Sequence, residues 1–180
     1  MRLAGRQIYL RPLELYDSNG SYPNWLNNPE VCRYNSHGES LYTREMAHTY
    51  IANTIDSPTI KVFAICLNDT NQHVGNISLQ QISTKNQSAE FAILLGEPSV
   101  YGRGIGYEAG QLLLEYAFTT LELHRIHCGT HIENIGMQRL ALKLGMIKEG
   151  IRRDALFKNN QFADIVEYGL LYNDYLKGQQ

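Results

Sequence analysis

Several features that would place the sequence in a particular class of protein are scarce or missing. Its 180 residues include only three cysteines, Cys32, Cys66 and Cys128. Their odd number and scattered spacing fit neither a disulfide framework nor a CxxC motif, so a reducing compartment is expected. No apolar run approaches the roughly 18 residues of a membrane span, and the N-terminus lacks the apolar core of a signal peptide. The sequence therefore predicts a cytoplasmic protein without a membrane partner.

An excess of charge of one sign is also missing. Sixteen Lys and Arg residues nearly balance 18 Asp and Glu residues, which gives a formal net charge of -2. The sequence thus carries no basic footprint for a nucleic-acid partner, and no block of like charges suggests a tail. The apolar fraction of 43% suits a single compact domain over residues 1–180 with its own core.

Hydrophobic periodicity and turn residues predict an alternation of strands and helices. Thr43 is expected to cap one helix, Gly145 to end another with a positive φ, and Gly75 to mark a bulge. Helical crossovers are expected only in the middle of the chain, which indicates a mixed α/β sheet. The expected strands cover residues 8–13, 59–67, 73–81, 89–95, 125–130, 147–157 and 162–172. The expected helices cover residues 16–28, 44–55, 111–121 and 134–144.

A glycine-rich turn at residues 100–109, Val-Tyr-Gly-Arg-Gly-Ile-Gly-Tyr-Glu-Ala, carries the strongest functional signal. It follows a strand-like run and precedes an apolar-periodic helix. Glycine lets the backbone approach a ligand closely and adopt positive φ. Free amides and the positive end of the dipole at a helix start attract anions. We therefore expect this turn to hold a phosphorylated cofactor.

The same turn allows a second interpretation. Gly104 to Ala109 fits G-x-G-x-x-A, the fingerprint of dinucleotide-binding proteins. In those proteins the strand runs directly into the first glycine, whereas residues 97–101 intervene here. No Walker lysine follows the glycines, which excludes a P-loop. A dinucleotide-dependent enzyme stays an alternative that binding of NAD, but not of CoA, would establish.

A second motif at residues 133–146, Glu-Asn-Ile-Gly-Met-Gln-Arg-Leu-Ala-Leu-Lys-Leu-Gly-Met, leads to a resemblance. Together with the glycine turn it resembles the GNAT superfamily of acetyl-CoA-dependent N-acetyltransferases. That family carries Q/R-x-x-G-x-G/A in a pyrophosphate loop and later a segment like E-N-x-x-S-x-x-x-x-E-K-L-G-F. The opening Ile-Tyr-Leu-Arg-Pro-Leu, Trp25 with Asn-Pro-Glu-Val, and the closing Asp-Ile-Val-Glu-Tyr are similar to the branch that acetylates the N-terminal alanine of ribosomal proteins.

The resemblance implies a fold and a co-substrate. The implied GNAT-like fold has a mostly antiparallel sheet of six to seven strands, helices on both faces, and a parallel pair, residues 89–95 and 125–130, that splays apart. The implied co-substrate is acetyl-CoA, without a metal. Residues 102–107 would hold its pyrophosphate, residues 93–95 would pair with its pantetheine arm, and the later helix would contact its tail or phosphates. The implied cofactor-binding residues are Ile93, Leu94, Leu95, Tyr101, Gly102, Arg103, Gly104, Ile105, Gly106, Tyr107, Asn134, Arg139 and Lys143.

The chemistry of acetyl transfer requires a base and an acid. A primary amine must lose a proton before it attacks a thioester, and Glu90 is the predicted general base, acting through water. An ordinary edge-strand carboxylate is the alternative for Glu90. Met137 stands where the family has a Ser near the sulfur, so the group that protonates the thiolate is not identified. The helix that begins at Asn134 could favour the thiolate through its dipole.

The acceptor is less well defined. The ribosomal-type branch favours a protein N-terminus, while amino sugars, polyamines and antibiotics stay alternatives. Because Met137 replaces the Ser, a non-catalytic CoA-binding module is a further alternative. A homodimer is a further partner that the resemblance implies. His124 and His127 lie three apart on a strand and point to opposite faces, and no Cys or carboxylate completes a ligand set with His131, so no metal site is predicted.

Overall fold

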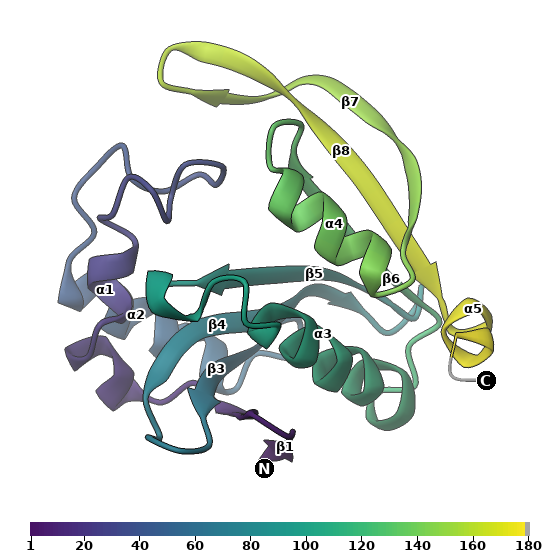
Figure 1. Cartoon of the computed structure of the whole chain (residues 1–180), viewed down its shortest axis with the longest axis horizontal. Coiled ribbons are helices and arrows are strands. Elements are labelled where there is room, and N and C mark those ends of the chain that lie inside the picture. The colour runs from purple at the N-terminus through teal and green to yellow at the C-terminus, as the bar shows by residue number, and fades with distance from the viewer. Residues whose placement is uncertain (179–180) are drawn as a thin grey trace.

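The computed structural model describes residues 1–178 of the chain. Within these residues the strands form one eight-stranded sheet in the order β1-β2-β3-β4-β5-β6-β8-β7 (Figure 1). All neighbouring strands are antiparallel except β5 and β6, which are parallel. The strands are β1 (Leu3–Ala4), β2 (Ile8–Pro12), β3 (Lys61–Leu67), β4 (His73–Ser83), β5 (Ser88–Leu95), β6 (Arg125–His131), β7 (Ile147–Lys158) and β8 (Gln161–Leu171).

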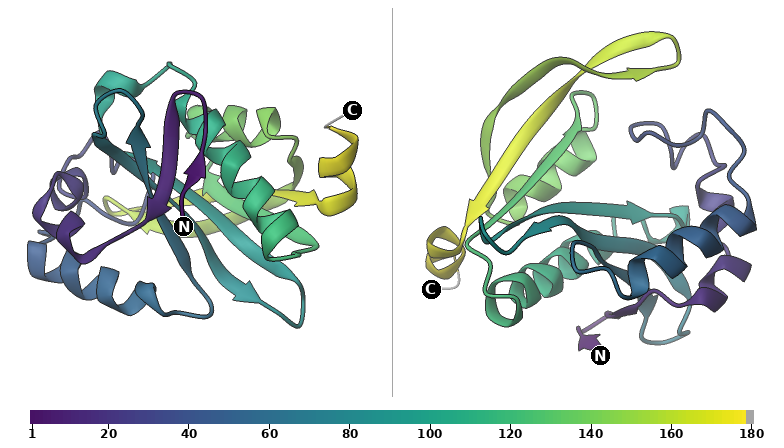
Figure 2. Two further views of the ribbon diagram at one scale, coloured as in Figure 1. Left: turned by 90° about the horizontal axis from the view of Figure 1, so that it is seen from below. Right: turned by 180° about the vertical axis from the view of Figure 1, so that it is seen from behind.

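Helices cover both faces of this sheet (Figure 2). Two of them, α1 and α2, lie on one face, whereas α3 and α4 lie on the other. The helices are α1 (Tyr22–Trp25), α2 (Arg44–Ile55), α3 (Ile105–Glu115), α4 (Ile135–Lys143) and α5 (Tyr172–Lys177), with 3-10 turns at Leu15–Asn19 and Pro98–Val100 and a π turn at Tyr116–Thr120. No helix of residues 1–178 is long and apolar enough to cross a membrane.

Alternation along β3 separates the two hydrophobic layers. Phe63 and Ile65 join the layer that packs against α3 and α4, while Val62, Ala64 and Cys66 join the layer beneath α1 and α2. Successive strand residues point to opposite faces, which is why one strand serves both layers.

The parallel pair separates soon after it forms. The register of β5 with β6 covers Ser88 to Glu90, which lie opposite Arg125 to His127. Beyond these residues β5 continues to Leu95 and β6 continues to His131 without pairing with each other. The strand edges that face each other across the gap thus keep backbone groups that a ligand can pair with. This splayed parallel pair and the mixed α/β fold confirm the predicted fold class.

Local signals account for most element ends. The Thr43 side chain accepts a hydrogen bond from Met46 N at 3.2 Å, as expected of a cap. Gly145 has a φ of +86°, as expected at the end of α4. The register of β3 with β4 shifts beside Gly75, where an added Cβ would lie 2.4 Å from the Leu94 carbonyl oxygen. The bulge predicted at this glycine is therefore confirmed.

Three expectations need correction. The sheet has eight strands among the described residues rather than six or seven, because the two-residue β1 pairs with β2. The helix expected over residues 16–28 is two short turns, which separate at Gly20 and Ser21. The last strand ends at Leu171, and α5, which was not predicted, follows it.

Candidate active site

A cleft of about 850 Å³ opens where β5 and β6 part. Such a volume lies within the usual range for small-molecule sites, roughly 300–1,000 Å³. The glycine turn and the start of α4 form one wall, and the loop at residues 30–36 approaches from the other side. Of the residues predicted to bind cofactor or act as base, those that line the cleft are Glu90, Ile93, Leu94, Leu95, Tyr101, Gly102, Gly104, Gly106 and Asn134.

The glycine turn forms an open cradle at the start of α3. Gly102 and Gly104 have φ of +74° and +80°, and a Cβ added to either would meet no atom within 4 Å. No side chain caps this helix, so its first N–H groups lack side-chain partners. Positive φ, open space and free amides at a helix start are the features that suit a bound phosphate. The turn thus fits the pyrophosphate that the sequence motif implies.

Tyr101 connects this turn to the end of β5. Its hydroxyl donates to the carbonyl oxygen of Leu95 at 2.9 Å, so that carbonyl already has a partner. The side chains of Ile93 and Leu95 lie closest to the position of a Cβ on Gly106, at 3.7 and 3.5 Å. The glycine at position 106 therefore lets α3 start close to β5.

Asn134 stands at the start of α4 and caps that helix. Its Oδ1 accepts from Met137 N at 3.1 Å, which satisfies one of the free amides of the first turn. Asn134, Gly136 and Met137 all line the cleft, so the positive end of the α4 dipole faces it. Contact of Asn134 with a cofactor stays a prediction beside this capping role.

Glu90 lies at the point where the two parallel strands separate. Its strand is interior to the sheet, between β4 and β6, which corrects the alternative of an edge-strand carboxylate. Gln81 Nε2 donates to Glu90 Oε2 at 2.7 Å. The pairing of β4 with β5 is irregular between Gln80 and Ser83, and Gln81 has a φ of +49°. This irregularity turns Gln81 toward Glu90 and leaves the carboxylate positioned in the cleft wall.

The other predicted cofactor residues do not line the cleft. Ile105 is buried in the core beneath α3. The Lys143 ammonium lies 4.2 Å from the centroid of the Tyr107 ring, a cation–π contact between α4 and α3. Arg103 and Arg139 are also absent from the lining residues. Contact of Arg103, Arg139 or Lys143 with cofactor phosphate stays a prediction.

A second pocket of about 310 Å³ adjoins the cleft on the side of α1 and α2. The two share Asn35, Ala92, Ile93 and Leu94 among their lining residues. Three neutral polar residues of β4 point into the second pocket, and aromatic side chains surround them. The second pocket is called the acceptor pocket, after the role proposed for it below. It is lined by Tyr22, Leu26, Asn35, His37, Tyr42, Tyr50, Ile60, Val62, Asn76, Ser78, Gln80, Ala92, Ile93 and Leu94.

The acceptor pocket has no carboxylate in its lining. Burial raises the pKa of the Tyr22, Tyr42 and Tyr50 hydroxyls, which keeps them neutral. Burial, and then the charge of Lys158, lower the pKa of His37. All four groups thus favour their uncharged forms. The sequence analysis did not single out the β4 residues of this pocket, although polar side chains at 76, 78 and 80 do follow the period of a strand.

The cleft lining includes a hydroxyl-bearing side chain outside the segment around Met137. Tyr34 lines the cleft from the loop at residues 30–36, and its ring centroid lies 5.3 Å from that of His131. His131 Nδ1 accepts from Glu133 N at 3.1 Å. Sequence reasoning named His131 only as a metal candidate. Within residues 1–178, no group of three or more His, Cys, Asp or Glu side chains is placed to hold a metal ion.

The sheet opens beside a glycine turn and the start of a helix. This arrangement is the one that the sequence motifs led us to expect of an acetyltransferase. Residues 7–147 match the family model described as an acetyltransferase (GNAT) domain. The chain belongs to this family, and it is an acetyl-CoA-dependent N-acetyltransferase with acetyl-CoA as its co-substrate. The family uses acetyl-CoA, so the alternative of an NAD-dependent enzyme is set aside.

Relatives match between about half and nearly all of the chain, and they differ in the acceptors that they are named for. The probable N-acetyltransferase YjcK of Bacillus subtilis is 30% identical, covering 90% of this chain and 92% of its own. The spermidine N(1)-acetyltransferase of Escherichia coli K12 is 26% identical, covering 96% and 90%. Bacillus subtilis YdaF, provisionally named a ribosomal N-acetyltransferase, is 32% identical over 56% of this chain and 55% of its own.

A solved structure shows the same fold with ligands present. The spermidine N-acetyltransferase of Vibrio cholerae, in complex with CoA and spermine, superposes with a TM-score of 0.86. It is 25% identical to this chain, and the match covers 94% of this chain and 98% of that protein. The likeness supports the GNAT fold and CoA as the co-substrate of the family.

Proposed function

We propose that this chain, folded as a single domain over residues 1–180, acetylates the α-amine at the N-terminus of a protein or peptide. A ribosomal protein is the candidate acceptor. The neutral lining of the acceptor pocket carries this proposal. A peptide backbone presents uncharged amides and carbonyls, and the hydroxyls and amides of the pocket are suited to them. Its one charged group would be the amine that lies near Glu90.

Polyamines form the second candidate class. They carry two or more ammonium groups, which proteins bind with carboxylates. The acceptor pocket offers no carboxylate, although Glu30 and Glu90 line the neighbouring cleft. The similarity to the spermidine acetyltransferases named above supports this candidate. The charge of the pocket favours the peptide N-terminus over the polyamine.

The residues of the cleft have distinct roles in this proposal. When bound, acetyl-CoA supplies an acetyl group activated as a thioester. The amides of residues 102–107 hold its pyrophosphate, and the free edge of β5 near Ile93 pairs with its pantetheine arm. Glu90, held by Gln81, removes a proton from the acceptor amine through water. The start of α4 stabilises negative charge on the departing sulfur.

The proposal is tested with a panel of amines and a measurement of CoA release. The panel contains short peptides that copy ribosomal-protein N-termini, spermidine and glucosamine, each at equal concentration with acetyl-CoA. We expect the highest kcat/KM with a peptide, and mass spectrometry should locate the acetyl group on its α-amine. Turnover of spermidine with none of any peptide would contradict the proposal and favour the second candidate.

The role of Glu90 is tested by the variant Glu90→Gln, which keeps the shape of the side chain and removes its basicity. Because a positioned general base contributes about a hundredfold or more, kcat should fall by about that factor. Binding of acetyl-CoA, measured by calorimetry, should stay within about twofold, because the cofactor backbone contacts lie elsewhere. Glu115→Gln, at the exposed end of α3, is the matched control. Equal kcat for Glu90→Gln and wild type would remove Glu90 from the mechanism.

A further inference from the structure

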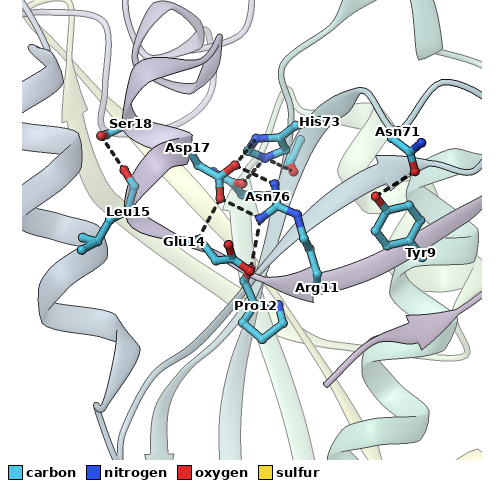
Figure 3. Close-up of polar contacts among 11 residues, drawn as sticks. Tyr9, Arg11, Pro12, Glu14, Leu15, Asp17, Ser18, Asn71, His73 and Asn76 are labelled. Carbon is cyan, nitrogen blue, oxygen red and sulfur yellow. Dashed lines mark hydrogen bonds and ion pairs between the residues drawn. The ribbon is translucent and has the colours of Figure 1, made fainter.

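A chain of polar contacts connects Arg11 of the N-terminal segment with Asn76, through Asp17 and His73 (Figure 3). Asn76 in turn lines the acceptor pocket. Arg11 donates to both carboxylate oxygens of Asp17, at 2.8 and 2.6 Å. Glu14 N donates to Asp17 Oδ2 at 2.8 Å, and His73 Nδ1 lies 3.5 Å from Asp17 Oδ1. Burial alone would raise the pKa of Asp17, but hydrogen bonds from Arg11, His73 and Glu14 N outweigh it and hold that pKa well below its usual range. The carboxylate is therefore ionised and fixed in place.

The imidazole of His73 lies between this carboxylate and the acceptor pocket. Its ring packs edge-on against Trp25, with centroids 4.9 Å apart. Its Nε2 lies 2.9 Å from the carbonyl oxygen of Gly75 and 2.8 Å from Oδ1 of Asn76. A carbonyl oxygen can only accept, so Nε2 must carry a proton.

The proton on Nε2 determines the orientation of the Asn76 amide. The atom of Asn76 that faces the Nε2–H group must be the oxygen, because an amide nitrogen there would place N–H against N–H. Nδ2 of Asn76 therefore points away from His73. Asn76 lines the acceptor pocket, keeps only 8% of its surface exposed, and its Nδ2 donates to no group within residues 1–178. Nδ2 is not among the fully buried atoms that lack a partner, so it is accessible from the pocket, where a ligand with an acceptor atom can pair with it.

We propose that Asn76 Nδ2 donates a hydrogen bond to a backbone carbonyl of the acceptor, and that Asp17 and His73 are positioning residues that hold the Asn76 amide in this orientation. This inference rests on the proposed acetylation of a peptide N-terminus, and it adds the residue that recognises the peptide. It also explains how this pocket would disfavour polyamines. An ammonium group near Asn76 would meet a fixed N–H donor, which cannot bind it.

The position of Asn76 along β4 fits an extended peptide. Gln80 lies opposite Glu90 in the sheet, and Asn76 lies opposite Leu94. Four residues of strand separate the two levels, or roughly 13 Å at about 3.3 Å per residue. Ser78 lies between them on the same face, and its Oγ accepts from Gln80 Nε2 at 3.1 Å. A peptide whose amine lies near Glu90 would thus bring the carbonyl of its third or fourth residue toward Asn76.

The inference is tested by replacing one peptide bond at a time in the substrate, and the comparison with Asn76→Ala assigns the effect to the contact with Asn76. The probes are a tetrapeptide amide and analogues in which a trans-alkene replaces one peptide bond, so that shape and charge stay unchanged. For one analogue we expect wild-type kcat/KM to fall about five- to tenfold, the usual effect of one neutral hydrogen bond. Asn76→Ala should lower kcat/KM for the parent peptide by a similar factor and should no longer distinguish it from that analogue. Asn86→Ala, in the exposed β4–β5 turn, should behave as wild type.

The positioning role of His73 has its own readout. His73→Leu removes the N–H group that orients Asn76, so discrimination between the peptide and the alkene analogue should disappear. His73→Gln can still donate to Asn76 Oδ1 and should keep the discrimination, provided that thermal unfolding shows both variants folded. Loss of discrimination in both variants, or in neither, would overturn the role of His73.

The outcomes separate this inference from the proposed function. If wild type acetylates peptides but every alkene analogue loses the same rate in wild type and Asn76→Ala, the inference is wrong and the proposed function stands. If spermidine is acetylated and peptides are not, both are wrong. Asn76→Asp gives a further check, because its carboxylate should weaken peptide turnover and lower the KM for spermidine by about tenfold, as a new charge-assisted contact would.

Discussion

At the scale of single residues, the buried pair of Arg11 and Asp17 should make the stability of the protein depend on pH. The Asp17 side chain is 2% exposed, and its pKa is lowered in the folded state. An unfolded aspartate has a pKa of about 3.9, so the pair stabilises the fold fully above about that pH. The stabilisation is lost as the pH falls from there through the folded pKa.

The variant Asp17→Asn should therefore lose about 3 kcal/mol of unfolding free energy near neutral pH, because it leaves the Arg11 charge buried without its partner. Its stability should also fall less than that of wild type between about pH 5 and pH 3. Urea denaturation at a series of pH values measures both effects. Asp69→Asn, in an exposed turn, is the control. Parallel pH curves for wild type and Asp17→Asn would show that the pair does not set this dependence.

Residues with a local motif could be found from the sequence, whereas residues joined by long-range contacts could not. Glu90 and the glycines of residues 102–106 stand in short patterns, and the structure brings them to one cleft. Asp17, His73 and Asn76 belong to three different segments, and only the folded sheet and its N-terminal turn bring them together. Their residue types alone do not distinguish them from surface polar residues.

At the scale of elements, the junction between the glycine turn and α3 supports a prediction about binding. Gly104 has a φ of +80° and open space around an added Cβ. Gly104→Ala should cost about 1–2 kcal/mol of stability through left-handed strain. Its methyl group would also stand in the cradle for the phosphates. If the methyl group displaces the phosphate from one backbone amide, one hydrogen bond to a charged group is lost. Acetyl-CoA binding, measured by calorimetry, should then weaken about tenfold or more.

A matched glycine separates the local effect from a general one. Gly150, in β7, has equally open space around an added Cβ, and its φ is not positive. Gly150→Ala should therefore keep both the stability and the acetyl-CoA affinity of wild type. If Gly104→Ala bound acetyl-CoA as tightly as Gly150→Ala does, the turn would not be the phosphate site.

Elements were predictable where a cap, a period and a turn agreed. Residues 44–55 have a capping Thr43, and the helix was expected with the bounds that the structure shows. The short elements were harder. The two-residue β1 has no periodicity of its own and exists because it pairs with β2. The helix α5 was missed for another reason. It follows directly on β8, and no break in the apolar pattern marks the boundary between the two.

At the scale of the whole molecule, the β7–β8 hairpin reaches back over the sheet toward the loop at residues 31–42 (Figure 1). Near its tip, Lys158 Nζ donates to the carbonyl oxygens of Cys32, Asn35 and His37 at 2.6, 2.5 and 2.5 Å. Asn35 lines both the cleft and the acceptor pocket, so this contact fixes part of the acceptor site. A lysine bound to backbone carbonyls more than 120 residues earlier leaves no pattern in the sequence, which is why the connection was not predicted.

The last prediction concerns this connection between the hairpin and the loop. Lys158→Met keeps much of the side-chain length and removes the charge. Hydrogen bonds from a charged group contribute about 1.5–3 kcal/mol each, so losing them should speed amide exchange in residues 32–38 by about tenfold or more. The KM for the acceptor should rise, because Asn35 and His37 would no longer be held in the pocket wall. Acetyl-CoA affinity should change little, because the glycine turn lies outside this contact.

Lys148→Met, on the exposed part of β7, is the matched control. Unchanged exchange in residues 32–38 would mean that packing rather than Lys158 holds the loop. A loss of acetyl-CoA affinity equal to the rise in acceptor KM would mean that the hairpin supports the whole cleft rather than the acceptor side alone.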